Sequence, residues 1–467
     1  MHPTIPGWIS TRLRSCCAAA ASILTLVAAP NAPAQTLDAR RLGMGGVVTS
    51  DMGAAEGANI AFRAVPKGRG HRSIPLPLGL IQFVADPPEF DSDSPDFNVF
   101  EIADLVMNPP LTLSLSRPDP VSSDVHVYVA QDSLSIDLED LRRIVPESSL
   151  QNGGVTHLPG ISVGFRKAFV GLSPIVHVQN QLDLDRAFRA VLRDAAPFTT
   201  RTRYGLADVG VAQGAIALQA GVALCALNVS APGKGEEEDE GDEDPRRNGA
   251  TALYLGAAPK YLYGIVYGDV RGVAGATTGD TLLGSGDPVA LDVAGRTRHA
   301  VTGGDGGSGH GFGADAGAVL YYRNFEFGIG FNDLASEIDW NVTERTHVYS
   351  DSLDEFTTTT TAVDRDFTSR IPVTTTINVA RRFGDTTIAA SIVDGPLSTS
   401  IHLGAEMWMG MLAVRAGTYR DTNDIWQVAG GGGVRFGKLG LDLAVASHQR
   451  YIEEKRAVEL AASLTLY

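Results

Sequence analysis

The residues able to carry catalysis or bind a metal are sparse and scattered in this sequence. Its 467 residues include 10 histidines and 3 cysteines, without the spacing of a metal site or the motif of an activated nucleophile. The adjacent pair Ser447-His448 lies in a segment of alternating apolar and polar residues, where neighbouring side chains point to opposite faces. The sequence therefore predicts no catalytic residue, no metal, no cofactor and a protein that is not an enzyme.

Two further motifs favour exposed connections. The acidic run 236–244 has the charge of a cation site without its spaced ligands, so we expect a solvated segment. The glycine-rich stretch 303–309 lacks the following Lys and Ser or Thr that a phosphate-binding P-loop needs. We interpret both motifs as loops between other elements.

The charge balance excludes one large class of function. Lysine and arginine number 38 against 54 aspartates and glutamates, which gives a net charge of −16. Nucleic-acid binding normally needs a basic face that displaces counterions from phosphates, so we expect no nucleic-acid partner. The chain also has 52 glycines, 24 prolines and 44% hydrophobic residues. This composition is too apolar for disorder and favours many short elements joined by turns.

The first 34 residues have the parts of a secretory signal peptide. Arg12 and Arg14 precede the apolar stretch 16–29, and the small residues of Ala32-Pro33-Ala34 form a cleavage site. We expect cleavage after Ala34, which leaves Cys225 as the one cysteine of the exported chain and allows no internal disulfide. Later segments lack the ~18 consecutive apolar residues of a membrane-spanning helix. The destination is therefore the periplasm, the exterior, or an outer membrane crossed by strands.

From about residue 368 onward, the chain alternates apolar and polar residues in segments separated by turn residues. The pattern is clearest in 439–446 and 458–466, and the segment 325–332 repeats it upstream. Strands with this period place each set of side chains on one face of a sheet.

Short turns near residues 384, 409 and 437 alternate with longer polar loops. An antiparallel barrel in the outer membrane has short turns on its periplasmic side and longer loops outside. The alternating segments are about ten to thirteen residues long. Strands of that length exceed the usual ~5–6 residues of soluble sheets and match the ~9–11 residues that cross a bilayer at a tilt. The pattern favours a barrel over the alternative of a soluble exported β-sandwich. The aromatic content of 7% is low for the two aromatic belts of such a barrel.

We therefore predict an all-β protein, an antiparallel transmembrane β-barrel of about 14 strands, within a range of roughly 12 to 16. The barrel is expected over residues 156–467, and residues 35–155 are expected to form an N-terminal plug, hatch or periplasmic segment. Residues 184–192 and 134–144 have helical patterns. The strand count places the acidic run on the periplasmic side, unless a further strand lies between Tyr267 and Phe312.

The polar residues between the apolar sets point into the lumen if the apolar sets face lipid. We expect them either to pair with one another and brace the interior, or to line a path for a ligand. Pairing is the favoured interpretation for each of them, because an unpaired charge is costly to bury. The lumen-lining candidates are Glu326, Asn332, His402, Glu406, Arg415, Gln427, Arg435 and Asp442.

The expected start of the exported chain carries a distinctive motif. Residues 41–47 are RLGMGGV, and residues 58–61 are Ala-Asn-Ile-Ala. The pair resembles the opening of FadL-like outer-membrane proteins, which include long-chain fatty-acid transporters, PorV-type secretion proteins and TraF-like barrels. Ile60 stands where that group has a proline. The resemblance implies a hatch inside the barrel, with Gly43, Gly45, Gly46 and Asn59 as its residues.

Two later segments add to the resemblance. Residues 315–318 leading into 327–332, and residues 403–406 followed by 414–417, are similar to late strands of PorV-type and TraF-like members. With the N terminus these matches touch about a third of the chain. The final residue, Tyr467, resembles the terminal aromatic residue that the barrel-insertion machinery recognises. It departs in phase, because it falls on the face opposite Leu464 and Leu466 in an ideal strand.

These observations lead to three hypotheses about function. The first is an outer-membrane barrel for passive transport of a hydrophobic or amphipathic small molecule, with a hatch that closes the lumen. Its partners would be outer-membrane lipid, the insertion machinery through the strand ending at Tyr467, and a lipid-like ligand. The second is a docking or shuttle barrel of a secretion or conjugation apparatus. The third is a soluble exported β-sandwich that binds a glycan or another protein.

Overall fold

Long antiparallel strands make up most of the computed structural model. One 18-stranded sheet contains all of them except β3, β4 and β8, which form a small separate sheet. The predicted signal peptide 1–34, the acidic run 236–244 and Tyr467 lie outside the described residues. The structure describes residues 38–52, 55–66, 72–76, 111–114, 125–130, 133–138, 149–157, 160–165, 167–194, 196–229, 251–280, 289–303, 307–350, 355–396, 399–420, 426–449 and 456–466.

Short helices precede the first strands, and strands dominate thereafter. The elements are α2 (Ala39–Gly43), η1 (Ala55–Gly57), η2 (Ile60–Arg63), β1 (Arg72–Leu76), β2 (Leu111–Ser114), β3 (Val125–Ala130), β4 (Ser133–Leu138), β5 (Ser149–His157), β6 (Ile161–Phe165), β7 (Ala168–Leu184), α6 (Arg186–Asp194), β8 (Phe198–Thr199), β9 (Arg203–Val229), β10 (Thr251–Thr278), β11 (Val289–Val301), β12 (Gly309–Tyr322), β13 (Phe325–Ser350), β14 (Glu355–Arg370), β15 (Thr374–Phe383), β16 (Thr386–Asp394), β17 (Thr399–Met409), β18 (Leu412–Arg420), β19 (Trp426–Phe436), β20 (Leu439–Gln449) and β21 (Arg456–Leu466).

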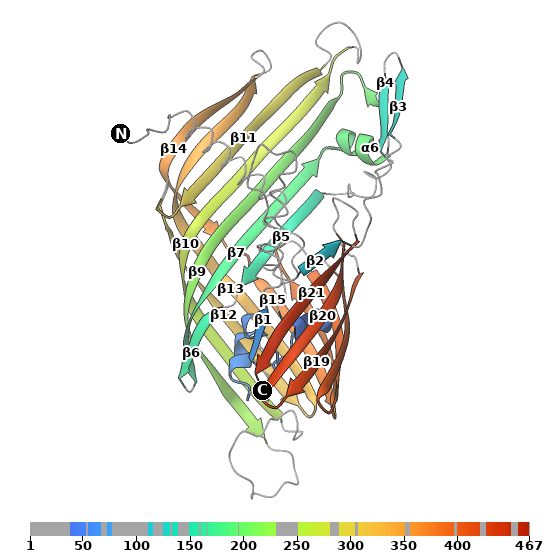
Figure 1. Cartoon of the computed structure of the whole chain (residues 1–467). Coiled ribbons are helices and arrows are strands. Elements are labelled where there is room, and N and C mark those ends of the chain that lie inside the picture. Colours follow the sequence, from blue (N-terminus) through green and yellow to red (C-terminus); the bar gives the residue numbers. More distant parts are fainter. Residues whose placement is uncertain are drawn as a thin grey trace, which may run out of the picture.

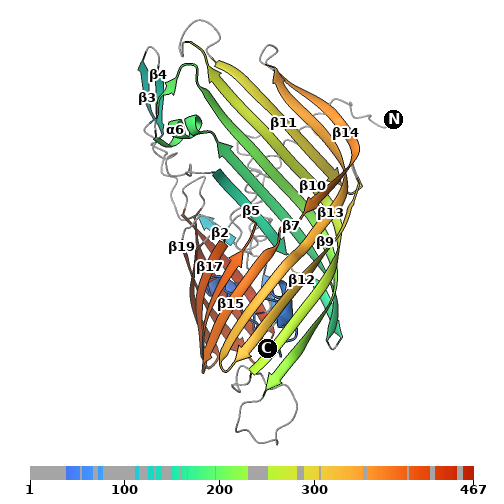
Figure 2. The ribbon, with the colours of Figure 1, turned by 180° about the vertical axis from the view of Figure 1, so that it is seen from behind.

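The sheet curls into a barrel (Figures 1 and 2). Among the described residues, fourteen strands pair one after another around the half of the barrel that holds the C-terminal strand. Their order is β6, β7, β9, β10, β12, β13, β15, β16, β17, β18, β19, β20, β21 and β1. The predicted all-β barrel of about 14 strands is confirmed. A single continuous sheet also excludes the two-sheet sandwich.

The tight turns gather at one end of the barrel. Gly384, Gly410 and Gly437 have φ of 58°, 64° and 60°, which glycine adopts without strain. These turns join β15–β16, β17–β18 and β19–β20, and β21 ends beside them because Leu466 pairs with Leu439. We call this the turn end and the opposite end the far end.

One side of the barrel extends well past the other at the far end. β9, β10 and β13 have 27, 28 and 26 residues, whereas β15 and β21 have 10 and 11. At about 3.3 Å per residue, ~15 further residues lengthen this wall by roughly 50 Å along the strands. β11 and β14 complete this wall, which rises above the short strands in Figure 1.

Strand β11 lies between Tyr267 and Phe312, where the sequence pattern predicted no strand. It does not reverse the direction of the strands that follow. It pairs with the far half of β10, whereas β12 pairs with the near half, so the two strands run in line and in one direction. β9 therefore ends and β10 begins at the turn end, where Val229 pairs with Thr251, and the acidic run 236–244 between them lies outside the described residues.

The outward face of the long wall changes character along β13. Near the turn end, Phe327 and Ile329 are 43% and 37% exposed on the outer face. Beyond Asp333 the arrangement inverts, because Ile338, Trp340 and Val342 are buried while the outward residues are polar: Glu337, Asp339 and Asn341. Asp333 and Ala335 have positive φ, and the pairing with β12 shifts register nearby, so a bulge marks the change. Along β13, the turn-end part therefore presents an apolar outer face suited to lipid, and the part beyond Asp333 presents a polar outer face suited to water.

Aromatic side chains border the lipid-facing band at both edges. The belt at the turn end contains Tyr322, Phe325, Phe383 and Phe436, and the belt toward the far end contains Tyr261, Tyr263, Phe312 and Trp426. Such rings sit at the two membrane–water interfaces of outer-membrane barrels.

Of the two segments predicted to be helical, one forms a helix and the other contains a strand. The helical pattern in 184–192 corresponds to α6, Arg186–Asp194. The helix expected over 134–144 is wrong where the structure describes it, since Ser133–Leu138 form β4, in which Leu134, Ile136 and Leu138 recur with the period of a strand. Residues 139–144 lie outside the described residues. No helix in the described part of the chain is long and apolar enough to span a membrane.

The predicted division at residue 155 differs from the strand pairing. Within 35–155, β1, β2 and β5 join the large sheet, and β5 crosses the boundary itself. β1 contains Pro75, which supplies no N–H for a second neighbour, but β1 lies at an edge of the described sheet, where proline is tolerated.

Candidate functional site

Residues 38–52 and 55–66, which together we call the inner segment, lie inside the turn-end half of the barrel (Figure 2). Helix α2 contacts β18 to β21, and η2 contacts β9, β10 and β12, so the segment crosses between opposite walls. Its apolar side chains are almost fully buried and pack on wall residues such as Tyr254 and Tyr321. They include Met44, Val47, Val48, Ala55 and Phe62.

Local signals in the sequence shape this segment. Asp38 caps α2 by accepting a hydrogen bond from the Arg40 amide at 2.9 Å. Gly45 and Gly46 follow the helix with φ of 68° and 79°, a conformation that ends the helix and favours glycine. Asn59 caps η2 in the same way, through the Ala61 amide at 3.0 Å. The motif that resembles the FadL-like opening thus consists of helix ends and tight turns.

Glycines on the wall admit the backbone of the inner segment. A Cβ atom at Gly404 would lie 2.2 Å from the Met44 carbonyl oxygen, and one at Gly417 would lie 2.2 Å from the Gly45 nitrogen. On the opposite wall, a Cβ atom at Gly330 would lie 2.2 Å from the Ala58 carbonyl oxygen. Larger residues at these positions would displace the segment.

An ion network joins the inner segment to the wall on one side. The Arg40 guanidinium donates to both oxygens of Glu406, at 2.8 and 2.6 Å, and to Asp51 Oδ2 at 2.9 Å. Arg415 donates to Glu406 at 2.6 Å and lies 2.7 Å from Asp442. Glu406, Arg415 and Asp442 are at most 2% exposed, so their opposite charges balance one another away from water. Among the described residues, Nη1 and Nη2 of Arg415 have no hydrogen-bond partner.

A second carboxylate holds the inner segment on the neighbouring strands. Glu326 accepts hydrogen bonds from the Ser50 amide at 3.0 Å and from the Ser50 hydroxyl at 2.6 Å. Tyr321 and Asn378 donate to the same carboxylate at 2.8 and 2.9 Å. Four donors satisfy a group that is 5% exposed, which removes most of the cost of burying it.

Neutral side chains complete the attachment. A ring nitrogen of His402, Nδ1, lies 2.8 Å from the Gly45 carbonyl oxygen, to which it donates, and Asn332 donates to the Gly57 carbonyl oxygen at 2.8 Å. Asn59 donates to the Ala318 carbonyl oxygen at 3.2 Å. Residues on several strands therefore hold both ends of the segment.

The structure brings most of the lumen-lining candidates to one place. Glu326, Asn332, His402 and Glu406 contact the inner segment directly, while Arg415 and Asp442 extend the ion network behind Glu406. Two others lie apart from it. Gln427 accepts from Ser447 at 2.9 Å, and Arg435 is half-buried near the turn end, where it donates to the Gly437 carbonyl oxygen at 3.3 Å.

Sequence reasoning missed several residues of the site. Arg40, Ser50 and Asp51 of the inner segment, and Tyr321 and Asn378 of the wall, were not among the candidates. Arg40 stands directly before the glycine motif, and Ser50-Asp51 follows it, so proximity to the motif was the available signal. The wall partners of Arg40 and Ser50 lie 366 and 276 residues away in the chain, which no local pattern reveals.

An apolar layer fills the interior farther from the turn end. It is formed by Ile175, Ala215, Ala217, Leu262, Tyr267, Ala300, Ile338, Trp340, Val342 and Ile371. A chain of polar contacts braces it, because Trp340 donates to Ser369 at 2.9 Å, and Ser369 donates to Gln213 at 2.6 Å. This interior differs from the polar lumen of a water-filled porin.

A buried charge cluster lies at the bulge of β13. Lys260 Nζ is 2.6 Å from Asp315 and 2.8 Å from Asp333, and the second oxygen of Asp333 is 2.7 Å from His157 Nε2. The cluster ties together β5, β10, β12 and β13. Among the described residues, no group of histidine, cysteine, aspartate and glutamate side chains could hold a metal ion.

No family model matches this chain, and no curated protein is similar to it in sequence. A mutant of the monoaromatic hydrocarbon channel TodX is similar in structure, with 10% identity and a TM-score of 0.26 over 72% of this chain and 96% of that one. The toluene transporter TbuX of Ralstonia pickettii has 12% identity and a TM-score of 0.26, over 69% of this chain and 90% of its own. TodX of Pseudomonas putida has 12% identity and a TM-score of 0.22, over 68% and 89%.

At 10% and 12% identity, residues of this chain have no reliable counterparts in those channels. The barrel assignment therefore rests on the strand pairings of this chain, and the site rests on its own contacts.

Proposed function

We propose that this barrel provides passive transport of a hydrophobic or amphipathic small molecule across the outer membrane, with the inner segment as its hatch. The observation that supports this best is the apolar layer around Trp340, Tyr267 and Leu262. Binding sites for apolar solutes are lined by such side chains, whereas channels for hydrophilic solutes have polar walls. A solute would leave water at this layer before it meets the hatch.

The mechanism is diffusion, with no bond made or broken. The solute moves from the far end past the apolar layer, and the hatch must shift locally to let it pass. Hydrogen bonds from Ser50 to Glu326 and from His402 to Gly45 are the contacts that such a shift would break. Each is replaceable by water, so a partial displacement costs less than unfolding the segment.

The same proposal includes the route to the membrane. Export through the signal peptide, cleavage near Ala34 and recognition of the last strand with Tyr467 would deliver the chain to the outer membrane. The turn end would then face the periplasm, together with the acidic run 236–244. The lipid-facing band between two aromatic belts supports this placement.

A reversible lock on the hatch tests the proposal. Ser391 accepts from the Val48 amide at 2.9 Å, so V48C/S391C, in a Cys225→Ser background, would link the inner segment to β16. We expect intact cells with the oxidised variant to accumulate the apolar probe pyrene severalfold more slowly, and reductant to restore the rate. V48C alone is the control. Equal accumulation in oxidised and reduced cells, with the disulfide verified by mass, would contradict the proposal.

The second candidate function is a docking or shuttle barrel. The tall wall at the far end favours it, since its outer face carries Glu337, Asp339 and Arg370 beyond the lipid-facing band. Stable co-purification with secretion components, and uptake of pyrene no faster than in cells without the protein, would favour docking over transport.

A further inference from the structure

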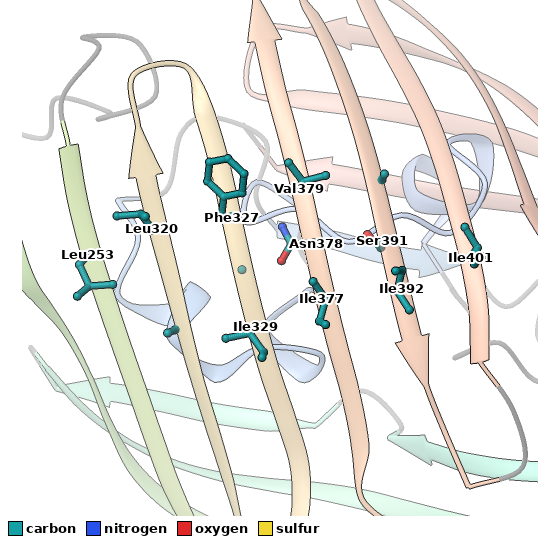
Figure 3. A pocket seen from close by; sticks show the side chains of 13 residues that line it. Leu253, Leu320, Phe327, Ile329, Ile377, Asn378, Val379, Ser391, Ile392 and Ile401 are labelled. Atoms are coloured by element: carbon teal, nitrogen blue, oxygen red, sulfur yellow. The ribbon is translucent and has the colours of Figure 1, made fainter.

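An apolar groove lies on the outer face of the barrel, away from the lumen. Its volume is about 470 Å³ (Figure 3). Residues of six neighbouring strands line it: β10, β12, β13, β15, β16 and β17. Ile377, Phe327 and Ile392 form its raised sides and are 47%, 43% and 42% exposed. Ala318 and Ala390 leave space between these longer side chains. The groove lies within the lipid-facing band, so an acyl chain is the group that it contacts.

An arginine stands at the turn-end side of this groove. Phe327 pairs with Val379 along the groove, and the next outward pair toward the turn end is Phe325 with Arg381. The Arg381 guanidinium carbon lies 4.6 Å from the ring centre of Phe325 and 4.2 Å from that of Phe383. Two rings therefore hold the cation in the aromatic belt, at the height of lipid head groups.

A second arginine lies close by at the same edge. Arg323 is in the turn between β12 and β13, and its guanidinium carbon is 5.2 Å from the ring centre of Tyr322. Among the described residues, neither Arg381 nor Arg323 forms an ion pair with a carboxylate. A guanidinium stacked on a ring keeps its N–H edges free, and these edges match the oxygens of a phosphate.

We propose that the groove and the two arginines form a binding site for one phospholipid, with an acyl chain along Phe327 and Ile377 and the phosphate at Arg381 and Arg323. Charge complementarity selects a phospholipid over an uncharged lipid, and the groove selects it over free phosphate. The site lies on the barrel wall over β13 and β15, the strands that carry Glu326 and Asn378 on their inner face. A bound lipid would steady this part of the wall, whatever the barrel transports.

Native mass spectrometry of the purified full-length chain tests the site. Three probes separate the sources of affinity: phosphatidylglycerol, diacylglycerol with the same chains, and inorganic phosphate. We expect one tightly retained phosphatidylglycerol, weaker retention of diacylglycerol and no retained phosphate. Arg381→Ala should weaken retention about tenfold, since a charge-assisted contact is lost, and Arg323→Ala should weaken it less. Ala390→Phe should fill the groove and weaken retention of both lipids.

Matched variants at the same surface serve as controls. Lys438→Ala removes a cation from the turn end at the β19–β20 turn, and Ala405→Phe adds a ring to the outer face of β17, outside the groove. Heat-modifiability on gels verifies that every variant keeps its barrel. Retention that Arg381→Ala leaves unchanged, or that Ala405→Phe weakens as much as Ala390→Phe, would overturn the site. Pyrene uptake is measured separately, so that failure of the lipid site and failure of the transport proposal remain distinct outcomes.

Discussion

Arg40 and Glu406 are 366 residues apart in the chain, yet the Arg40 guanidinium meets both oxygens of the Glu406 carboxylate, at 2.8 and 2.6 Å. The pair connects the inner segment to β17 inside the barrel, and Arg415 shares the same carboxylate at 2.6 Å. Two cations thus depend on one buried anion. This arrangement makes the attachment of the inner segment sensitive to a single side chain.

The first prediction concerns that shared anion. Glu406→Gln leaves Arg40 and Arg415 with a neutral partner in a buried place, so the free energy of unfolding should fall by ~3–5 kcal/mol. Chemical denaturation in detergent micelles, followed by tryptophan fluorescence, measures the loss. Glu337→Gln is the matched control, because its pair with Arg370 is largely exposed and should cost at most about 1 kcal/mol. Equal losses in the two variants would disprove a special role for Glu406.

The second prediction concerns the close approach at Gly404. Gly404→Ala places a Cβ atom against the Met44 carbonyl oxygen, so the inner segment must shift away from β17. We expect a clear rise in ion conductance across planar bilayers, as water enters the gap. Gly430→Ala, on β19, is the control, because its Cβ atom would lie 3.8 Å from the nearest atom. A conductance that does not differ between these variants would show that the segment does not limit permeation.

The third prediction concerns the apolar layer. Trp340→Ala removes its largest side chain, which should lower the free energy of unfolding by ~3–5 kcal/mol and open a polar path. Uptake of a small sugar should rise relative to uptake of pyrene in cells with equal amounts of barrel. Phe312→Ala provides the comparison, since Phe312 is 71% exposed on the outer face and should leave the ratio unchanged. An unchanged ratio in Trp340→Ala would rule out selection by this layer.

The fourth prediction concerns the charge cluster at the bulge. Lys260→Met leaves Asp315 and Asp333 close together without their shared cation, at a cost of ~3–5 kcal/mol in the free energy of unfolding. Adding Asp315→Asn should recover part of that loss, because Asp333 keeps His157 at 2.7 Å. Denaturation of the two single variants and the double variant gives the coupling energy. Strictly additive losses would mean that the cluster does not act as a unit.

The fifth prediction concerns topology. A cysteine at Gly241 in the acidic run, in a Cys225→Ser background, should resist a membrane-impermeant maleimide in intact cells, because β9 and β10 meet at the turn end. Arg201→Cys should react, since the Arg201 side chain is 77% exposed near the far end. Permeabilised cells should label at both positions. Labelling of the Gly241 cysteine in intact cells would reverse the proposed orientation.

Much of the barrel was predictable because alternation and turns are local properties. The period of residues 439–446 identifies a strand and its two faces, and glycines at 384, 410 and 437 mark turns whatever lies beside them. The pattern of apolar residues gave a wrong prediction at 134–138, because so short a segment does not distinguish the period of a helix from that of a strand. It also stopped short in β13, since the apolar set moves from the outer to the inner face at Asp333. Alternation separates two faces without stating which one meets lipid.

The amino-acid sequence by itself determined the class of fold, the approximate strand number and the inward face of several polar residues, such as Glu326 and Glu406. Tertiary structure alone decided what those residues do. Glu326, His402 and Glu406 could have lined an open path, but the inner segment occupies that space and takes up their hydrogen bonds. The reason is physical, because a local pattern specifies a face, whereas the partner of a buried charge depends on which distant residue closure of the barrel brings within about 3 Å.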